Sequence, residues 1–280
     1  MAETGEPLRL KFTPLAGSAD ADELFVVGPS LGTSVSALWG RCAAFLGHRF
    51  EVVGWDLPGH GNSRPATAPF SVAQLADAVR AKSTELAAGR HAYYAGVSLG
   101  GAVGFDLAMG VSSFAGVAAV SSAPRIGQPS AWRERAELVR GAGTGVMRAG
   151  SAERWFATGF VERHPEVAGA LLDSLSETDA LSYAFACEAL ADFDLSERVA
   201  GVRVPVLLMP GEHDGVVPPS DAPAIATSMA GAHVQVVAGA AHLPPAENPR
   251  GVADLLGAFA DRVRTDRHPP GSRPTEEAAR

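Results

Sequence analysis

The chain has 280 residues, of which 46% are hydrophobic, and a formal net charge of −8 at pH 7. This length and apolar content suit one large domain with a sizeable core, with or without an inserted lid. The acidic balance and the lack of a Lys/Arg-rich stripe argue against nucleic acid as a partner.

Targeting signals are not evident in the sequence. Residues 1–7 lack the basic and apolar regions of a signal peptide, and no uninterrupted apolar segment is long enough to cross a bilayer. We therefore expect a cytoplasmic protein that does not associate with membranes. The two cysteines fall in helical apolar patterns and are expected to be buried free thiols.

Short apolar strands and amphipathic helices alternate over the first 120 residues. Strands are expected at residues 8–15, 24–28, 50–56, 91–97 and 114–120, and helices at residues 35–46, 71–86 and 99–110. Ser34 is placed to cap the first of these helices. The alternation predicts an α/β fold, with a mostly parallel sheet and helices on both faces.

Residues 125–199 break this alternation, because only helical patterns occur there, over residues 130–140, 151–160, 165–175 and 179–190. We interpret this segment as a helical lid inserted after the sixth strand, although it could also be a packing appendage. The sheet resumes with strands at 204–209 and 233–237, a helix that Asp221 begins, and a last helix over 249–264. The predicted organisation is a core of residues 1–124 and 200–264, a lid of residues 125–199, and a flexible tail or linker of residues 265–280.

A candidate nucleophile lies at the end of the apolar run that precedes residue 98. The sequence Gly96-Val-Ser98-Leu-Gly100 sits between a predicted strand and a predicted helix, which is the arrangement of a nucleophile elbow. Side chains at positions 96 and 100 would collide with the sharp turn, so glycine is required there. The helix that follows would direct its N-terminal amides at the group that Ser98 attacks.

A serine hydroxyl needs a general base, which in turn needs an acid to orient it. The chain order Ser98, Asp214, His242 is that of α/β-hydrolase triads, and the acid and base each follow a predicted strand at its carboxyl end. Glu212 is the one rival to Asp214. His60 lies closer to the site than most other histidines and is expected to brace its loop.

The tetrahedral intermediate needs two backbone N–H donors, which we assign to Leu99, after the nucleophile, and to Leu31, after the first buried strand. No GxGxxG or Walker spacing occurs, and no His/Cys/Asp cluster suits a metal. We therefore expect neither a cofactor nor a metal ion.

Several segments together resemble one family. They are residues 24–38 with the loop Ser30-Leu-Gly-Thr33, Asp56-Leu-Pro-Gly-His-Gly-Asn-Ser63, Gly96-Val-Ser98-Leu-Gly-Gly101, Ala123-Pro-Arg-Ile-Gly-x-Pro-x-x-Trp132, Arg154-Trp-Phe156, Ala191-Asp-Phe-Asp-Leu195 and Ala241-His-Leu243. The chain is similar over residues 8–264 to α/β-hydrolases, and within them to the 3-oxoadipate enol-lactone hydrolases of the β-ketoadipate pathway. The lid segments carry the narrower resemblance.

The resemblance implies hydrolysis of an anionic enol-lactone to 3-oxoadipate. The substrate carboxylate then needs donors, for which we expect Trp132 first, through its indole N–H, and Arg125 second, with Ser30 also contacting the substrate. Arg133, Arg135 and Arg154 are further candidates. In some bacteria this hydrolase is fused to a carboxymuconolactone decarboxylase, which makes that enzyme a possible partner.

Other functions fit the same scaffold, since a fold does not determine a substrate. A broad carboxylesterase or a carbon–carbon bond hydrolase is the first alternative, and an acyltransferase is a weaker one. A hydrolase-fold protein that binds a small molecule without turning it over is a different class, against which the Ser/His/Asp set argues.

Overall fold

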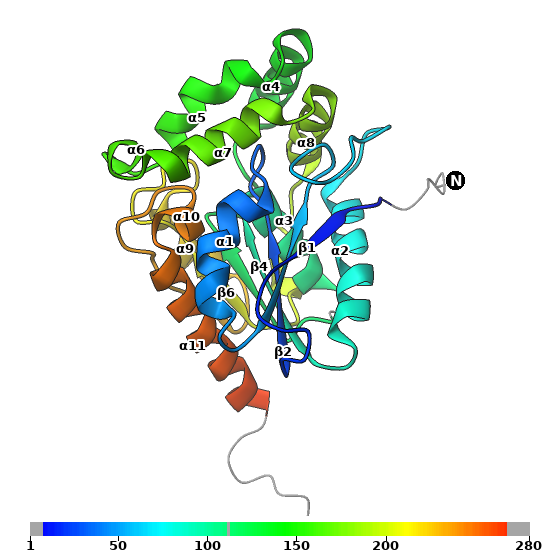
Figure 1. The fold of residues 1–280 in the computed structure, drawn as a ribbon. Helices are drawn as coiled ribbons and strands as arrows, with labels where there is room; N and C mark the ends of the chain where they lie inside the picture. The colour runs from blue at the N-terminus through cyan, green and yellow to red at the C-terminus, as the bar shows by residue number, and fades with distance from the viewer. Residues whose placement is uncertain (1–7, 111–112, 268–280) are drawn as a thin grey trace, which may run out of the picture.

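The computed structural model describes residues 8–110 and 113–267. Its centre is a seven-stranded sheet with the order β1-β3-β2-β4-β5-β6-β7, in which β1 pairs antiparallel with β3 and all other pairs are parallel (Figure 1). The strands are β1 (Lys11–Ala16), β2 (Glu23–Gly28), β3 (Glu51–Asp56), β4 (His91–Val97), β5 (Gly116–Val120), β6 (Val206–Met209) and β7 (Ala232–Val234). The predicted α/β fold with a mostly parallel sheet is confirmed.

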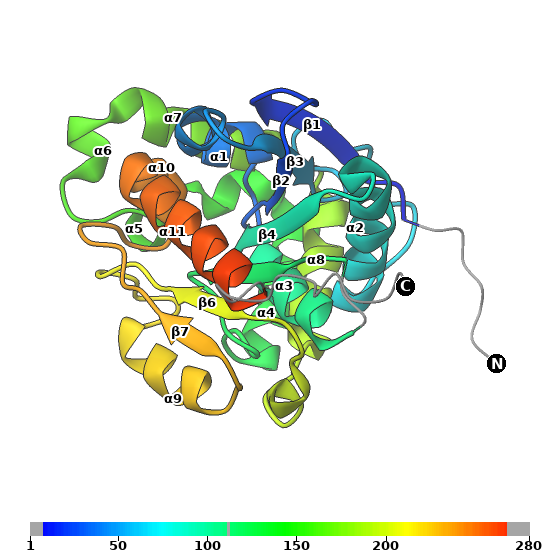
Figure 2. The ribbon, with the colours of Figure 1, turned by 90° about the horizontal axis from the view of Figure 1, so that it is seen from below.

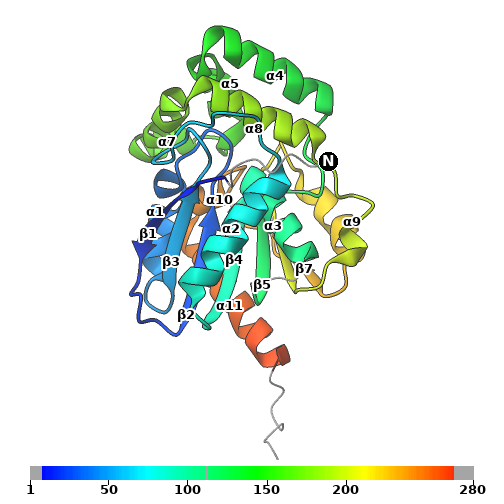
Figure 3. The ribbon, with the colours of Figure 1, turned by 90° about the vertical axis from the view of Figure 1, so that its right-hand side faces the viewer.

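Helices cover both faces of this sheet. On one face lie α1 (Val35–Leu46), α10 (Pro244–Glu247) and α11 (Pro249–Arg267), and on the other lie α2 (Val72–Ala87) and α3 (Leu99–Met109) (Figure 3). The short helix α9 (Ala222–Thr227) lies beside β7, at the opposite edge of the sheet from β1 (Figure 2). Because helices cover the central strands on both faces, these strands are almost continuously apolar and buried, as parallel strands usually are.

The predicted helix starts follow from side-chain capping. Helix α1 begins after Ser34, whose hydroxyl accepts the N–H of Ala37 at 3.3 Å. Helix α2 begins after Ser71, which forms a capping box with Gln74. Asp221, in contrast, makes no side-chain cap, because its backbone is already helical in a short 3₁₀ turn, η3 (Pro219–Asp221).

Residues 125–199 form a separate layer of helices above the carboxyl ends of the strands (Figures 1 and 3). The layer, called the helical insertion below, contains α4 (Pro129–Ala142), η1 (Thr144–Met147), α5 (Arg148–Trp155), α6 (Phe160–Arg163), α7 (Pro165–Glu177) and α8 (Ala180–Asp192), with η2 (Val199–Gly201) at its end. Helix α4 packs on α8, and α7 contacts α1. In the described chain the insertion follows the fifth strand, β5, and not the sixth, because a single strand precedes β2.

Other helix boundaries also differ by a few residues from the sequence predictions, as α5 and α11 show. The helix expected over residues 151–160 ends at Trp155, since Phe156 is extended (φ −117°, ψ 142°) and Gly159 has a left-handed φ of 76°. Helix α11 continues to Arg267, past the expected end at residue 264. The rest of the expected tail, residues 268–280, lies outside the described residues.

The described chain contains no helix both long and apolar enough to span a bilayer. Cys42 and Cys187 are buried free thiols, as expected, and burial raises the pKa of both.

Candidate active site

Ser98 occupies the sharp turn between β4 and α3. Its φ of 54° and ψ of −112° are unfavourable for a side chain with a Cβ, a conformation that costs about 1–3 kcal/mol. Hydrogen bonds hold the turn: the Ser98 N–H donates to the carbonyl of Val120 at 2.9 Å, and the Ser122 hydroxyl donates to the Ser98 carbonyl at 2.8 Å. The strained backbone raises the serine hydroxyl above the end of the sheet.

The two glycines of the turn are there for steric reasons. A Cβ on Gly96 would collide with the carbonyl oxygen of Gly100, and a Cβ on Gly100 would lie 2.5 Å from the carbonyl oxygen of Pro29. The Gly100 N–H donates to that same carbonyl at 3.0 Å. The close approach therefore joins the serine turn to the loop after β2.

His242 and Asp214 meet above β6 and β7. The Nδ1 atom of His242 lies 3.0 and 3.1 Å from the two carboxylate oxygens of Asp214, and both side chains are buried. Burial opposes ionisation of Asp214, but the hydrogen bond and charge of His242 and the N–H groups of Val217 and Val216 outweigh it, so the pKa of Asp214 lies below its usual value. An ionised carboxylate only accepts, so Nδ1 carries the proton and Nε2 is left as the basic nitrogen.

Glu212, the rival acid, is turned away from the imidazole. Its carboxylate is exposed and accepts the N–H of Gly239 at 2.9 Å. Among the described residues, the hydrogen bonds of His242 are those to Asp214 and, through its backbone N–H, to the carbonyl of Trp155 at 3.1 Å. No direct bond joins it to Ser98. Such contacts are often long in unliganded enzymes and tighten when substrate binds.

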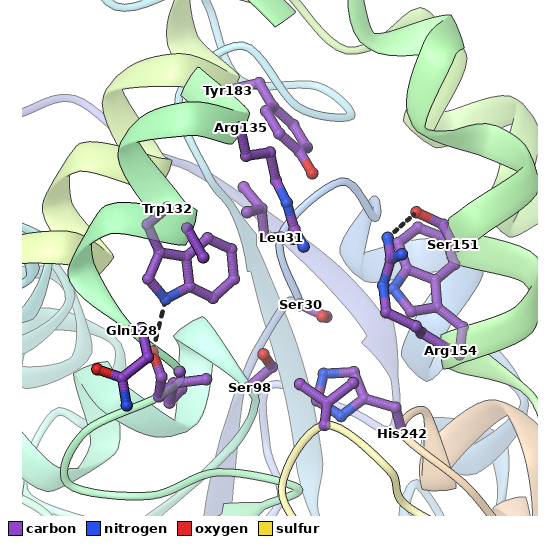
Figure 4. A pocket seen from close by; sticks show the side chains of 15 residues that line it. Ser30, Leu31, Ser98, Gln128, Trp132, Arg135, Ser151, Arg154, Tyr183 and His242 are labelled. Carbon is purple, nitrogen blue, oxygen red and sulfur yellow. Dashed lines mark hydrogen bonds between the residues drawn. The ribbon is translucent and has the colours of Figure 1, made fainter. Parts of the chain in front are cut away.

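Ser98 and His242 face one cavity of about 150 Å³ between the sheet and the helical insertion (Figure 4). The cavity is lined by Ser30, Leu31, Ser98, Ile126, Gly127, Gln128, Ala131, Trp132, Arg135, Ser151, Arg154, Trp155, Tyr183, Val216 and His242. Drug-sized ligands usually need about 300 Å³ or more, so this volume suits a ligand with few atoms.

Of the two expected oxyanion donors, Leu31 lines this cavity and Leu99 directly follows Ser98 in the chain. Leu99 is the first residue of α3, so its N–H has no acceptor within the helix. The N–H groups of Leu31 and Leu99 donate none of the backbone hydrogen bonds that the described chain forms outside its helices and strands. Thr33 shapes the Leu31 loop, because its hydroxyl accepts the N–H of Ser30 at 3.1 Å and donates to the Ser30 carbonyl at 2.9 Å.

The first two residues expected to bind the substrate carboxylate are not available for it in this structure. Trp132 lines the cavity, but its indole N–H donates to the carbonyl of Ile126 at 2.5 Å, so it presents a flat apolar wall and no donor. Arg125 is exposed outside the cavity and lies 3.6 Å from the carboxylate of Asp194. Ser30 lines the cavity, with its hydroxyl directed into it (Figure 4).

Two other arginines reach the cavity instead. Arg135, from α4, lies over the ring of Trp132 with its Cζ 4.6 Å from the ring centroid, and Arg154, from α5, donates to the Ser151 hydroxyl at 3.4 Å. Within residues 8–110 and 113–267, neither guanidinium forms a salt bridge. Burial lowers the pKa of Arg154, and the charge of Arg135 lowers it further. The cavity therefore holds excess positive charge that an anionic ligand would neutralise.

Helical spacing could have selected Arg135 from the sequence. It follows Trp132 by three positions and therefore shares its face of the helix, whereas the adjacent Arg133 points outward and pairs with Asp192 at 2.6 Å. Arg154 has no such signal, because its place depends on the break in the helix after Trp155.

His60 supports the wall of the cavity from behind. It is fully buried, its ring stacks on Tyr183 at 6.2 Å between centroids, and its Nδ1 lies 2.9 Å from the carbonyl of Pro58. Burial lowers the pKa of His60 to about 4, although the Pro58 carbonyl and the charge of Asp179 partly raise it. His60 is thus a neutral residue that braces its loop, as the sequence predicts.

No group of three or more His, Cys, Asp or Glu side chains in the described part of the chain could hold a metal ion. The reactive and charged groups that line this site include the Ser98 hydroxyl, the His242 imidazole and the guanidinium groups of Arg135 and Arg154.

Comparisons with known proteins identify the family of this chain. Residues 24–255 match the model of the alpha/beta hydrolase family. The chain is 32% identical to 3-oxoadipate enol-lactonase 2 of Acinetobacter baylyi, over 88% of this chain and 91% of that protein, and 28% identical to 3-oxoadipate enol-lactonase 1 of the same organism, over 85% and 89%. The crystal structure of the enol-lactonase from Burkholderia xenovorans LB400 superposes with a TM-score of 0.83 at 30% identity, covering 90% of this chain and 96% of that one. The chain therefore belongs to the alpha/beta hydrolase family, as an ester-hydrolysing enzyme similar to the 3-oxoadipate enol-lactonases.

Proposed function

We propose that this enzyme hydrolyses 3-oxoadipate enol-lactone to 3-oxoadipate through an acyl-enzyme on Ser98. The observation that carries the proposal is the pair Arg135 and Arg154, two half-buried guanidinium groups without carboxylate partners in the described chain, in the same small cavity as Ser98 and His242. A small lactone with one carboxylate matches this combination of volume and charge. The similarity to enol-lactonases over most of the chain supports the same substrate.

In the acylation step, His242 Nε2 takes the proton of the Ser98 hydroxyl as the oxygen attacks the lactone carbonyl. Asp214 fixes the imidazole through Nδ1 and stabilises the imidazolium that forms. The N–H groups of Leu99 and Leu31 donate hydrogen bonds to the carbonyl oxygen as negative charge develops on it, and one such donor is worth about 3 kcal/mol.

The leaving group explains why this site needs little acid assistance. When the ring opens, the departing enol becomes a ketone, so the bond to the ring oxygen breaks easily. The imidazolium of His242 then gives its proton to the enolate of the opened ring, which stays attached to Ser98 through the acyl group, and water activated by the same nitrogen cleaves the acyl-enzyme and releases 3-oxoadipate. The free carboxylate of the substrate lies between Arg135 and Arg154, with Trp132 as an apolar wall beside the ring.

In this proposal, residues 125–199 are the lid over a core of residues 1–124 and 200–264. The lid supplies both arginines and the wall, so it determines the substrate, while the core supplies the nucleophile, base and acid. The place of the reaction in the β-ketoadipate pathway, a cytoplasmic location and a carboxymuconolactone decarboxylase as fusion or partner stay predictions.

The test is the loss of enol-lactone absorbance on addition of enzyme, run beside hydrolysis of p-nitrophenyl acetate. We expect a preference for the lactone, and a preference for the neutral ester would favour the broad carboxylesterase. Ser98→Ala is expected to abolish both activities and covalent labelling by a serine-reactive phosphonate, while the circular dichroism spectrum is unchanged. Undiminished turnover in that variant would refute the triad.

A further inference from the structure

A second carboxylate lies close to His242 and has no part in the proposed reaction. Glu247 closes the short helix α10, five residues after His242, and is half-buried. Its Oε1 accepts the N–H groups of Ala241 at 2.9 Å and Leu243 at 3.3 Å. The two amides that flank His242 in the chain are therefore held by one oxygen atom.

The other oxygen of the same carboxylate reaches the helical insertion. Glu247 Oε2 accepts the N–H of Ala157 at 2.7 Å, and the N–H of His242 donates to the carbonyl of Trp155 at 3.1 Å. Residues 155–157 and the loop that carries His242 thus each donate one hydrogen bond to the other. Trp155 is the last residue of α5, the helix that bears Arg154.

A carboxylate suits this position because all three partners are donors. Burial raises the pKa of Glu247 above its usual value. The N–H groups of Ala157, Ala241 and Leu243 and the charge of His242 lower this pKa, but by less than burial raises it. An ionised carboxylate accepts all three N–H groups, whereas an amide offers one oxygen only. Removing the side chain would leave three N–H groups without their partner.

We propose that Glu247 is a positioning residue that holds the imidazole of His242 towards Ser98 and ties that orientation to the helical insertion. It touches no reacting atom and acts through the backbone on both sides of the base. The inference rests on the proposed role of His242 as general base, but not on the identity of the substrate. Displacement of a catalytic group by about 1 Å can lower a rate about 100-fold, so a small shift of this loop has a measurable effect.

The experiment compares Glu247→Gln and Glu247→Ala with the parent enzyme, and uses Glu212→Gln as the matched control. Glu212 also binds an N–H of this loop, that of Gly239, but it is exposed and does not flank His242. The measurements are kcat and KM for p-nitrophenyl acetate and the rate of Ser98 labelling by a phosphonate, all well below the melting temperature of each variant. Neither reagent carries a carboxylate, so neither depends on Arg135 or Arg154.

We expect kcat and the labelling rate to fall about 3- to 10-fold in Glu247→Gln and about 10- to 100-fold in Glu247→Ala, with KM within about twofold of the parent. Glutamine is milder because it keeps one acceptor, and Glu212→Gln is expected to match the parent. If both Glu247 variants keep their kcat and labelling rate when folded, and lose only thermal stability, the residue is merely structural and the proposal is wrong. Failure of the proposed triad would appear separately, as turnover by Ser98→Ala.

Discussion

Arg135→Met and Arg154→Met should separate recognition of the substrate carboxylate from the chemistry of ester cleavage. Methionine matches the unbranched part of the arginine side chain up to Nε and removes the charge and the donors. The matched control is Arg125→Met, since Arg125 belongs to the same insertion but pairs with Asp194 outside the cavity.

The magnitude follows from the surroundings of the two guanidinium groups. A hydrogen bond to a charged group contributes about 1.5–3 kcal/mol, and the lower part of this range applies because both arginines are only half-buried. A loss of about 1.5–2 kcal/mol corresponds to a decrease of about 10- to 30-fold in kcat/KM for the anionic lactone. The double variant is expected to lose less than the product of both factors, because both arginines bind the same carboxylate.

The assay measures kcat/KM for the enol-lactone and for p-nitrophenyl acetate with each variant. For the neutral ester we expect Arg135→Met and Arg154→Met to remain within about threefold of the parent, and Arg125→Met to match the parent with both substrates. Equal losses with both substrates would show that the arginines act on the reacting centre or on the fold. A loss confined to Arg125→Met would refute the assignment outright.

Three further perturbations test the site and its support. Asp214→Asn is expected to lower kcat about 10⁴-fold because an amide cannot hold the required imidazole tautomer, and equal loss in Glu212→Gln would contradict this choice of acid. Gly100→Ala should unfold at a lower temperature and lose activity, since its Cβ would lie 2.5 Å from the Pro29 carbonyl oxygen; a parent-like melting curve would oppose this reading. The pKa of His60 is about 4 in the folded protein and 6.5 in the unfolded chain. As the pH falls, the unfolded chain therefore binds a proton before the folded protein does, and about 3 kcal/mol of folding stability is lost between pH 6.5 and pH 4. Urea titrations of His60→Asn across this range should show a flatter acid dependence than the parent, and an unchanged slope would exclude His60 as its source.

Local sequence patterns were enough to predict most helices and strands of the core. Strands β2 and β3 are short, with apolar residues between their charged ends, and α1 begins where Ser34 can cap it, so composition and capping were enough to find them. The helical insertion was harder, because its helices are held by contacts with one another and with the core. The early end of α5 at Trp155 shows this, since the next residues leave the helix to bury Phe156 and to donate the Ala157 N–H to Glu247.

Chain order and strand ends were sufficient to nominate Ser98, Asp214 and His242, because parallel strands bring their carboxyl ends to one edge of the sheet whatever their separation in sequence. The residues of the helical insertion that face the cavity could not be chosen in that way. Helical spacing puts Arg135 on the same face as Trp132, but only the packing of α4 and α5 over the sheet shows that this face and Arg154 line a cavity, whereas Arg125 lies outside it. The sequence alone therefore determined the candidate nucleophile, base and acid, since these depend on residue types at local turns. The tertiary structure decided which charges surround Ser98, since that depends on how the helical insertion packs over the sheet.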